Sequence, residues 1–126
     1  LLEPTKIYVK EIQALSKKVN IKAMAHITGG GLLGNLERIL SKKYSFLLER
    51  KSLFSFNNNL FSYLMKQANL TEKDMLKTFN CGYGMVLVVD RDDAKEVFKS
   101  LKKLKQKFKI IGKVKSTSGD PEVQVV

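Results

Sequence analysis

The sequence contains few of the residues from which metal sites and disulfides are built. In 126 residues there is one cysteine, Cys81, and one histidine, His26. A single cysteine excludes an intrachain disulfide and a cysteine-cluster zinc site, and a single histidine excludes a site with several histidine ligands. A chain without disulfides suits a reducing compartment, so we expect a cytoplasmic location.

Cys81 has two interpretations, because it stands next to Gly82 in a glycine-containing segment. One is a thiol close to a binding site. The other is an inert side chain in the core, which is the usual state of a lone buried cysteine. The acidic residues stand mostly where helices are predicted to begin. Helix capping explains that placement more simply than Mg²⁺ binding, so we expect no metal site in this chain.

Long apolar runs and a leader segment are also missing. No apolar run approaches the ~20 residues that a membrane span requires, so we expect no membrane partner. The N-terminal residues lack the basic-then-apolar order of a secretory signal. The chain begins with Leu1 rather than methionine, which indicates either processing or a fragment of a longer protein.

Arginine is scarce in a strongly basic chain. Lysine and arginine number 23 against 12 acidic residues, for a net charge of +11, and the arginines are Arg38, Arg50 and Arg91. The charge favours anionic partners, but arginine grips phosphates and bases better than lysine does. Because the lysines are spread along the chain, a solvated surface is favoured and we expect no nucleic-acid partner. A basic nucleic-acid-binding module is the rival hypothesis.

The apolar pattern predicts a single domain, residues 1–126, of the α/β (α+β) class. Helices alternate with strands, which indicates a layered domain with a mixed β-sheet flanked by helices. The last two strands are expected to form an antiparallel hairpin. The predicted strands are 21–27, 44–48, 85–89, 108–114 and 123–126, and the predicted helices are 5–19, 32–40, 60–68, 71–79 and 90–105, with a loop or helix start at 57–59.

Several local features sharpen this prediction. Thr5 is the expected N-cap of the first helix, with the lysines at 17–18 in its last turn. Asp90 is the expected cap of the helix 90–105. Thr71–Asp74 has the form of a capping box. The apolar run Val86–Val89 predicts a central strand that is buried on both faces.

The chain is organised around a glycine-rich turn between a predicted strand and a predicted helix. Thr28 and three consecutive glycines, Gly29, Gly30 and Gly31, separate the strand 21–27 from the helix 32–40. Glycine lacks a Cβ, so it adopts positive φ and lets a ligand approach the backbone closely. The first turn of the following helix offers free N–H groups and the positive end of its dipole, which suit an anion.

The glycines alone match neither the dinucleotide-binding G-x-G-x-x-G pattern nor the Walker-A loop. A purely structural connection is therefore an equal alternative. The polar neighbours favour a site, because His26 ends the strand and Thr28 offers a hydroxyl. Asn35 and Arg38 are three residues apart and share a helix face, although the pattern does not say whether that face reaches the turn.

A second glycine-containing segment, Asn80-Cys81-Gly82-Tyr83-Gly84, precedes the strand 85–89. A bulge or tight bend is its simplest interpretation.

Three segments carry a resemblance to a known family. They are Leu1–Lys10 (LLEPTKIYVK), Ala25–Gly31 (AHITGGG) with Asn35 and Arg38, and Thr78–Met85 (TFNCGYGM). Together they resemble the C-terminal domain of the phosphoribosylformylglycinamidine cyclo-ligase (aminoimidazole ribonucleotide synthetase) family. The resemblance covers nearly the whole chain, with the motifs in the right order. It departs in the Asn-rich stretch 51–59 and at Gly34, where a larger polar or charged residue is common.

The resemblance implies the fold of that superfamily's C-terminal domain and an ATP-dependent ring closure in purine synthesis. Formylglycinamidine ribonucleotide and ATP become aminoimidazole ribonucleotide, ADP and phosphate. ATP phosphorylates the formamide oxygen, and the amidine nitrogen then closes the imidazole ring. The family's complete enzyme is a homodimer. Its N-terminal domain binds the ATP and Mg²⁺ and makes most of the dimer contact, so this chain is expected to be the C-terminal half, inactive by itself.

The resemblance and the glycine turn together suggest roles for individual residues. His26 is the expected catalytic residue, which hydrogen-bonds the reacting amide or passes a proton, because imidazoles exchange protons near neutral pH. Arg38 is expected to hold a phosphate by a bidentate pair. The residues expected to bind the phosphorylated substrate are Thr28, Gly29, Gly30, Gly31, Asn35, Arg38, Asn80, Gly82 and Gly84, the last three forming the opposite wall.

Related ATP-using enzymes, such as selenophosphate synthetase and thiamine-monophosphate kinase, are rivals within the superfamily. The opening Leu-Leu-Glu-Pro-Thr-Lys-Ile-Tyr argues against them. The gene sequence upstream of Leu1 discriminates best between the ligase and the rival hypotheses, because the ligase requires an N-terminal ATP domain in frame.

Overall fold

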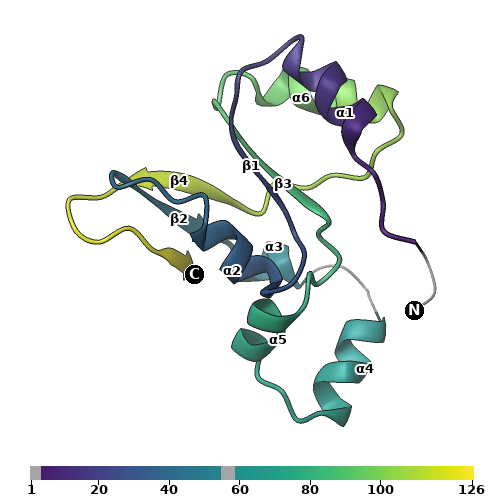
Figure 1. Ribbon diagram of the computed structural model, residues 1–126, viewed down its shortest axis with the longest axis vertical. Coiled ribbons are helices and arrows are strands. Elements are labelled where there is room, and N and C mark those ends of the chain that lie inside the picture. Colours follow the sequence, from purple (N-terminus) through teal and green to yellow (C-terminus); the bar gives the residue numbers. More distant parts are fainter. Residues whose placement is uncertain (1–3, 55–58) are drawn as a thin grey trace. The chain divides into compact units, whose positions relative to one another are not determined.

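The computed structural model describes residues 4–54 and 59–126 (Figure 1). The helices are α1 (Val9–Ser16), α2 (Gly31–Glu37), α3 (Arg50–Leu53), α4 (Asn59–Gln67), α5 (Glu72–Thr78) and α6 (Ala94–Lys103). The strands are β1 (Ile21–His26), β2 (Tyr44–Leu48), β3 (Met85–Val89), β4 (Gly112–Ser116) and β5 (Val123–Val125). The predicted α+β class with a mixed sheet is confirmed.

The described residues divide into two compact units. The first contains residues 4–24 and 85–108, and the second contains 25–54, 59–84 and 109–126. Each unit is therefore assembled from chain segments that are far apart in the sequence. No helix in the described ranges has the length and apolar content needed to cross a membrane.

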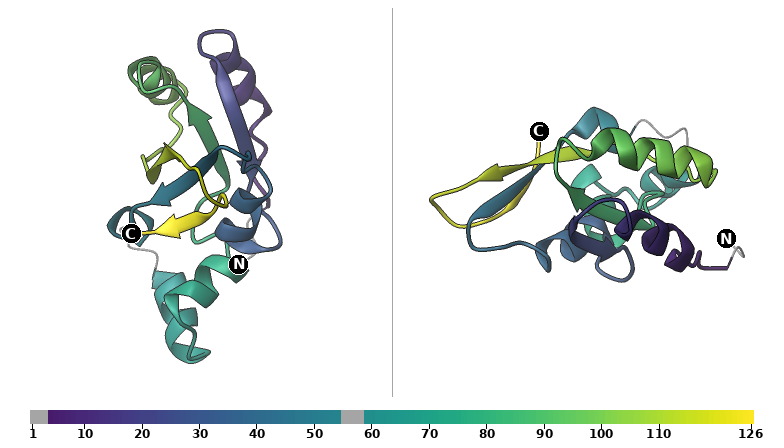
Figure 2. Two further views of the ribbon diagram at one scale, coloured as in Figure 1. Left: turned by 90° about the vertical axis from the view of Figure 1, so that its left-hand side faces the viewer. Right: turned by 90° about the horizontal axis from the view of Figure 1, so that it is seen from above.

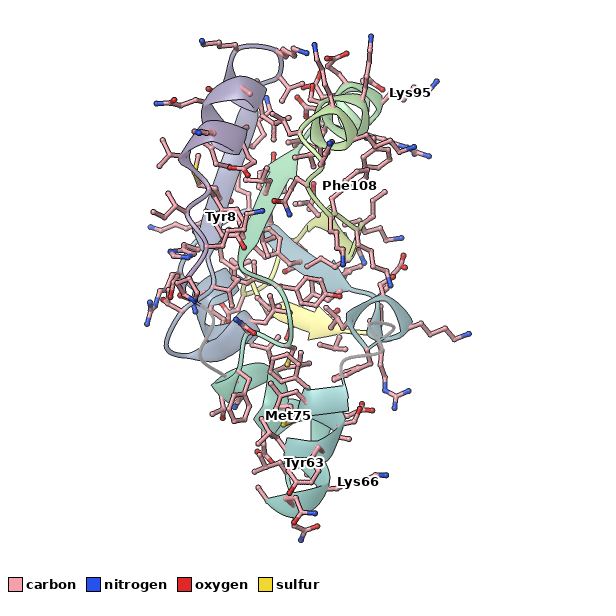
Figure 3. All side chains as sticks on the ribbon, turned by 90° about the vertical axis from the view of Figure 1, so that its right-hand side faces the viewer. Tyr8, Tyr63, Lys66, Met75, Lys95 and Phe108 are labelled. Atoms are coloured by element: carbon pink, nitrogen blue, oxygen red, sulfur yellow. The ribbon has the colours of Figure 1, made fainter. Side chains whose placement is uncertain are left out.

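The first unit has its core between α1 and α6, which lie side by side (Figure 1). Its buried residues are Leu15, Val19, Val97 and Leu101, and the partly buried Ile21, Leu87, Val89, Phe98 and Phe108 pack against them. The rings of Phe98 and Phe108 stack with their centroids 5.0 Å apart. The exposed face of α6 is basic, and Lys95 points away from the helix into solvent (Figure 3).

The predicted start of the first helix is wrong. α1 begins at Val9, its N-cap is Tyr8 rather than Thr5, and Tyr8 makes no side-chain cap hydrogen bond. The helix ends at Ser16, so the lysines at 17–18 lie beyond its last turn. The segment before the helix makes one contact distant in sequence, in which the Lys6 ammonium donates to the side-chain carbonyl of Gln106.

The start of the helix α6 also differs from the prediction. The helix begins at Ala94 with Asp93 as N-cap, and Asp90 does not cap it. The Asp90 carboxylate instead pairs with Lys22 of β1 at 3.1 Å, and residues 91–93 form a turn. An ion pair with a neighbouring strand has replaced the expected local cap.

The strand β3 lies where it was predicted, but it is not a central strand buried on both faces. It pairs with β1 in a two-stranded sheet, as far as the described residues show, and all five of its residues are half-buried. Consecutive apolar residues do not distinguish a fully buried strand from one with partial cover on each face.

The second unit is built on a three-stranded sheet with β2 in the centre. β4 is antiparallel to β2, with Leu48 opposite Gly112, and β5 is parallel to β2, with Phe46 opposite Val123. The same direction of β2 and β5 is visible in Figure 2. The expected antiparallel hairpin of the last two strands is therefore wrong: β4 and β5 occupy opposite edges of β2.

Backbone and side-chain contacts explain this strand order. After β4, the chain crosses to the other edge of β2, where the backbone N–H of Phe46 donates to the carbonyl of Glu122 at 3.0 Å. The hydroxyl of the buried Ser45 accepts from the Glu122 N–H at 3.1 Å. The strand predicted over 108–114 begins only at Gly112, where a Cβ would lie 2.2 Å from the Leu47 carbonyl oxygen.

The helices of the second unit include α2 and α5, which pack against each other (Figure 1). The capping box predicted at Thr71–Asp74 is confirmed, with the Thr71 hydroxyl and the Asp74 carboxylate bonding each other's backbone N–H. α4 lies where it was predicted, and Asn57 and Asn58 fall outside the described residues. The core residues of this unit are Ala25, Ile27, Leu32, Leu33, Leu36, Phe46, Leu48, Leu53, Met75, Leu76, Cys81 and Tyr83.

Candidate functional site

The glycine turn lies at the end of β1, between that strand and α2. Exposure alternates along the second half of the strand, so that Ala25 is buried and His26 is exposed. The next residue, Ile27, is buried, and the segment Thr28–Gly30 is exposed. The turn therefore presents an open stretch of backbone, with His26 close to it in the chain.

The three glycines meet different demands. Gly30 and Gly31 adopt φ of +95° and +65°, which side chains rarely tolerate, whereas Gly29 does not. A Cβ on Gly31 would lie 2.5 Å from the carbonyl oxygen of Leu76, so this buried glycine lets α2 approach α5. Among the described residues, a Cβ on Gly29 would meet nothing within 4 Å. Gly31 therefore has a packing reason to be glycine, while Gly29 borders open space.

The backbone N–H groups of the turn fall into two sets, those that donate to a protein acceptor and those that do not. The Gly31 N–H donates to the Thr28 carbonyl at 3.2 Å, and the Leu32 N–H donates to the Phe79 carbonyl at 3.2 Å. Within residues 4–54 and 59–126, the N–H groups of Gly29 and Gly30 have no protein acceptor. The exposed turn thus offers two backbone donors to an anion.

Arg38 reaches this turn, which the sequence pattern could not show. Its Nη1 donates to Asn35 Oδ1 at 3.3 Å, and its Nη2 lies 3.7 Å from the position that a Cβ on Gly30 would take. The guanidinium is therefore beside the open N–H groups, and the Arg38 residue is exposed. A cation and backbone donors on one exposed face can hold a phosphate.

Asn35 lies on the inner side of the same turn and is 5% exposed. Its Nδ2 donates to the Gly31 carbonyl at 2.7 Å and to the Thr28 and Gly29 carbonyls at 3.3 Å. The side chain thus bonds the backbone of the turn itself.

The second glycine segment forms a tight turn of its own. The side-chain oxygen of Asn80 accepts from the Gly82 N–H at 3.0 Å, and the Tyr83 N–H donates to the Asn80 carbonyl at 2.9 Å. Cys81 and Gly82 both have positive φ, of +51° and +90°. Asn80 and Gly82 are exposed, whereas Gly84 is half-buried.

The structure brings the two glycine segments together. The N–H of Ile27 donates to the carbonyl of Gly84 at 2.9 Å, and the Leu32–Phe79 bond lies on the other side of the first turn. Hydrogen bonds on both flanks of Thr28–Gly31 thus tie it to the segment 79–84. All ten predicted site residues belong to this one region, although Gly31 and Asn35 are buried within it.

Sequence reasoning missed the part that Tyr83 takes in this region. Its hydroxyl donates to the Ser52 carbonyl at 2.8 Å and lies 3.3 Å from the Leu53 carbonyl, so it fixes the second segment to α3. Burial raises the pKa of this phenol to about 12. An aromatic residue between two glycines was the available signal, because a turn seldom needs a large side chain.

Cys81 is an inert core residue by every measure of its surroundings. It is 6% exposed, and its Sγ lies 3.6 Å from the carbonyl of Met75, a residue of α5 labelled in Figure 3. Burial raises the pKa of the thiol to about 11, which keeps it protonated at neutral pH. The described residues include no group of three His, Cys, Asp or Glu side chains placed to hold a metal ion.

Comparison with known proteins identifies the family. The family model described as "AIR synthase related protein, C-terminal domain" matches residues 1–124. The chain belongs to this family. The glycine turn, Arg38 and the segment 79–84 are therefore features of an AIR synthase related C-terminal domain.

Individual relatives of this AIR synthase related domain are similar along nearly its whole length. Phosphoribosylformylglycinamidine cyclo-ligase of Finegoldia magna (strain ATCC 29328 / DSM 20472 / WAL 2508) is 41% identical over 125 residues, 99% of this chain and 36% of that protein. The enzyme of the same name from Thermoanaerobacter sp. (strain X514) is 40% identical over 119 residues, 94% of this chain and 34% of that protein. The trifunctional purine biosynthetic protein adenosine-3 of Gallus gallus is 43% identical over 114 residues, 90% of this chain and 11% of that protein. The chain thus spans about a third of the cyclo-ligases that it matches.

Proposed function

We propose that this chain is the C-terminal domain of a phosphoribosylformylglycinamidine cyclo-ligase. The complete enzyme converts formylglycinamidine ribonucleotide and ATP into aminoimidazole ribonucleotide, ADP and phosphate in purine biosynthesis. The observation that carries this proposal is identity of 40–41% with proteins of that name over 94–99% of the chain. The gathering of both glycine segments around one exposed turn supports it, because a phosphorylated substrate needs such a surface.

In this proposal the exposed turn holds the phosphate of the substrate. The N–H groups of Gly29 and Gly30 supply backbone donors, and the Arg38 guanidinium supplies a charge-assisted pair. The Thr28 hydroxyl adds a further donor, and Asn80, Gly82 and Gly84 form the opposite wall. Since Gly31 is buried against α5, its contribution is to shape the turn.

His26 acts on the reacting amide in the same proposal. The ring closure forms one C–N bond: the amidine nitrogen attacks the formamide carbon, and the formamide oxygen, phosphorylated by ATP, leaves as phosphate. The attacking nitrogen loses a proton in this step. An exposed imidazole beside the turn can accept that proton or orient the amide by a hydrogen bond.

The remaining parts of the reaction are assigned to the part of the enzyme beyond this chain. We propose that an N-terminal domain holds ATP with Mg²⁺ and makes most of the contact of a cytoplasmic homodimer. The chain has no Walker-A lysine loop, and the described residues hold no cluster of carboxylates for Mg²⁺. Purified alone, the 126-residue chain should neither hydrolyse ATP nor close the ring.

The proposal is tested with the complete enzyme. The gene upstream of Leu1 should encode an ATP domain in frame, and the purified product should form ADP only when formylglycinamidine ribonucleotide is present. A complete enzyme that makes no ADP with that substrate refutes the proposal. Turnover by the isolated chain that scales with protein refutes the division of roles.

The roles of His26 and Arg38 need a separate measurement in the complete enzyme. Arg38→Ala should weaken apparent substrate affinity by about 10- to 100-fold, the loss of a charge-assisted contact. His26→Ala should lower the rate by about 10²- to 10⁴-fold if the imidazole transfers a proton. Melting temperatures of the same preparations supply the control: variants that are destabilised but fully active would assign both residues to the scaffold.

A further inference from the structure

We propose that Asn35 is a positioning residue that aims the phosphate-binding groups of the turn and does not itself contact substrate. The inference rests on the proposed function and revises the expectation that Asn35 binds substrate. It depends on three features of the side chain: its burial, its donors and its acceptor.

The donors of Asn35 are already in use. A side-chain amide has two N–H donors, and Nδ2 lies 2.7 Å from the Gly31 carbonyl and 3.3 Å from those of Thr28 and Gly29. The opposite amide orientation would place Oδ1 against the same three carbonyl oxygens, so the network fixes which end is nitrogen. At 5% exposure, the amide has neither a spare donor nor an open face for a ligand.

These bonds set the direction of the N–H groups of the turn. In a trans peptide the C=O and the following N–H lie in one plane and point in opposite directions. The Thr28 carbonyl is in the same peptide as the Gly29 N–H, and the Gly29 carbonyl is in the same peptide as the Gly30 N–H. By drawing both carbonyls inward, Asn35 turns the two N–H groups outward, where they have no protein acceptor in the described ranges.

The third carbonyl contact acts on the second glycine segment. The Gly31 carbonyl shares a peptide with the Leu32 N–H, which donates to the Phe79 carbonyl at 3.2 Å. The shortest Asn35 bond, 2.7 Å to the Gly31 carbonyl, therefore holds the peptide that joins the turn to the neighbouring segment.

The acceptor of Asn35 orients Arg38. Its Oδ1 accepts from Arg38 Nη1 at 3.3 Å, and the guanidinium is thereby held beside Gly30. An exposed arginine otherwise samples many rotamers, so a fixed partner lowers the entropy lost when a phosphate binds. One buried amide thus sets the direction of two backbone donors and one cation.

The first test uses the complete wild-type enzyme and inorganic phosphate as the probe. In a ¹H–¹⁵N titration, the backbone amides of Gly29 and Gly30 and the Arg38 side chain should shift, while the Asn35 side-chain amide keeps its position. A titration in which the Asn35 amide shifts most makes it a ligand and overturns the inference. A titration without shifts at the turn also overturns it, because the N–H groups of the turn and the Arg38 guanidinium then bind no phosphate.

The second test uses kinetics of the complete enzyme with Asn35→Ala. The measurement is made at a temperature where circular dichroism shows that the variant is folded. KM for formylglycinamidine ribonucleotide should rise about 10-fold or more while kcat changes less, since the phosphate-binding groups are no longer held in the binding orientation. Ser45→Ala is the matched control: this residue is also buried, bonds backbone through its side chain, and is not in the proposed site. It should lose stability without a change in KM.

The variant Arg38→Ala with Asn35→Ala completes the test. If Asn35 acts in part through Arg38, the double variant should lose less affinity than the sum of the two single losses. Equal stability losses in Asn35→Ala and Ser45→Ala with wild-type KM in both would make Asn35 a scaffold residue only. If the wild-type enzyme has no cyclo-ligase activity, the proposed function fails, but the phosphate titration still decides the inference.

Discussion

The backbone conformation and the room for a Cβ at each position decide which glycines of the turn the fold requires. Gly31 combines a φ of +65° with a packing distance that leaves no room for a Cβ, whereas Gly29 has neither restriction. Gly31→Ala should therefore lower the free energy of unfolding by more than about 2 kcal/mol, from backbone strain plus the clash with α5. Gly29→Ala should change it little. Urea unfolding of the pair measures the difference, and equal stabilities would contradict the packing argument.

A second residue-scale prediction concerns Cys81. Its thiol is buried and its pKa is raised to about 11, so little thiolate forms at neutral pH. At pH 7.5 a thiol reagent should label the folded chain far more slowly than the chain unfolded in urea. The rate of absorbance change with a disulfide reagent measures this. Labelling of the folded chain as fast as that of the unfolded chain would restore the interpretation of Cys81 as a thiol near a site.

The individual residues also show how far the sequence could define the site. Local order placed Thr28 and the glycines on one turn, with His26 at the end of the preceding strand, because they are neighbours in the chain. The burial of Asn35 could not be predicted, since it depends on the turn folding back over α2. The contact of Gly31 with α5 could not be predicted either, because its partners Leu76 and Lys77 lie far along the chain. The roles of these residues in binding and catalysis stay predictions.

At the scale of elements, the capping box of α5 gives a clean test of local helix signals. The Thr71 hydroxyl accepts from the Asp74 N–H at 3.2 Å, and the Asp74 carboxylate accepts from the Thr71 N–H at 3.0 Å. Thr71→Ala should lower stability by about 1 kcal/mol, and the melting temperature by a few degrees. Thr5→Ala is the control, because Thr5 resembles a cap in sequence but α1 begins elsewhere. A similar loss in both variants would contradict the assignment.

The elements that the sequence predicted correctly are those whose signals are local. β2 was predicted over its observed residues, and β5 and α5 to within a residue at each end. The errors arose where a distant partner intervened: Lys22 engages Asp90 before α6, and β2 separates β4 from β5. Neither the pairing order of strands nor an ion pair between elements produces a periodic pattern in a single sequence. The hydropathy pattern could therefore predict where strands lie in the chain, but not which strands pair.

At the scale of the whole molecule, ionisable groups in both units set a range of pH for maximum stability. Hydrogen bonds from Arg50, Thr71 and Lys18 lower the pKa of Glu72, Asp74 and Glu96, respectively. Burial raises the pKa of the Cys81 thiol and the Tyr83 phenol. The carboxylates belong to exposed or half-buried residues, so we expect the acidic limb of the stability curve to be shallow and to weaken in high salt.

The sign of each limb follows from linkage between proton binding and folding. A carboxyl with a lowered folded pKa stabilises the native state above its ordinary value, and this stabilisation disappears as the pH falls through the folded pKa. A thiol or phenol with a raised pKa behaves in the opposite way. Its stabilisation is complete below the ordinary values of 9.0 and 10.0 and is lost as the pH rises towards about 11 and about 12. Stability should therefore be highest between about pH 5 and 8.5.

Melting temperatures measured from about pH 3 to 11.5 test this expectation, and three variants separate the causes. Cys81→Ala and Tyr83→Phe should each be less stable at neutral pH, because one loses core volume and the other its bonds to α3. Each should nevertheless show a smaller fall above pH 9, since the titrating group is gone. Glu72→Gln should flatten the acidic limb alone. An alkaline fall that is unchanged in both Cys81→Ala and Tyr83→Phe would contradict its assignment to the thiol and the phenol.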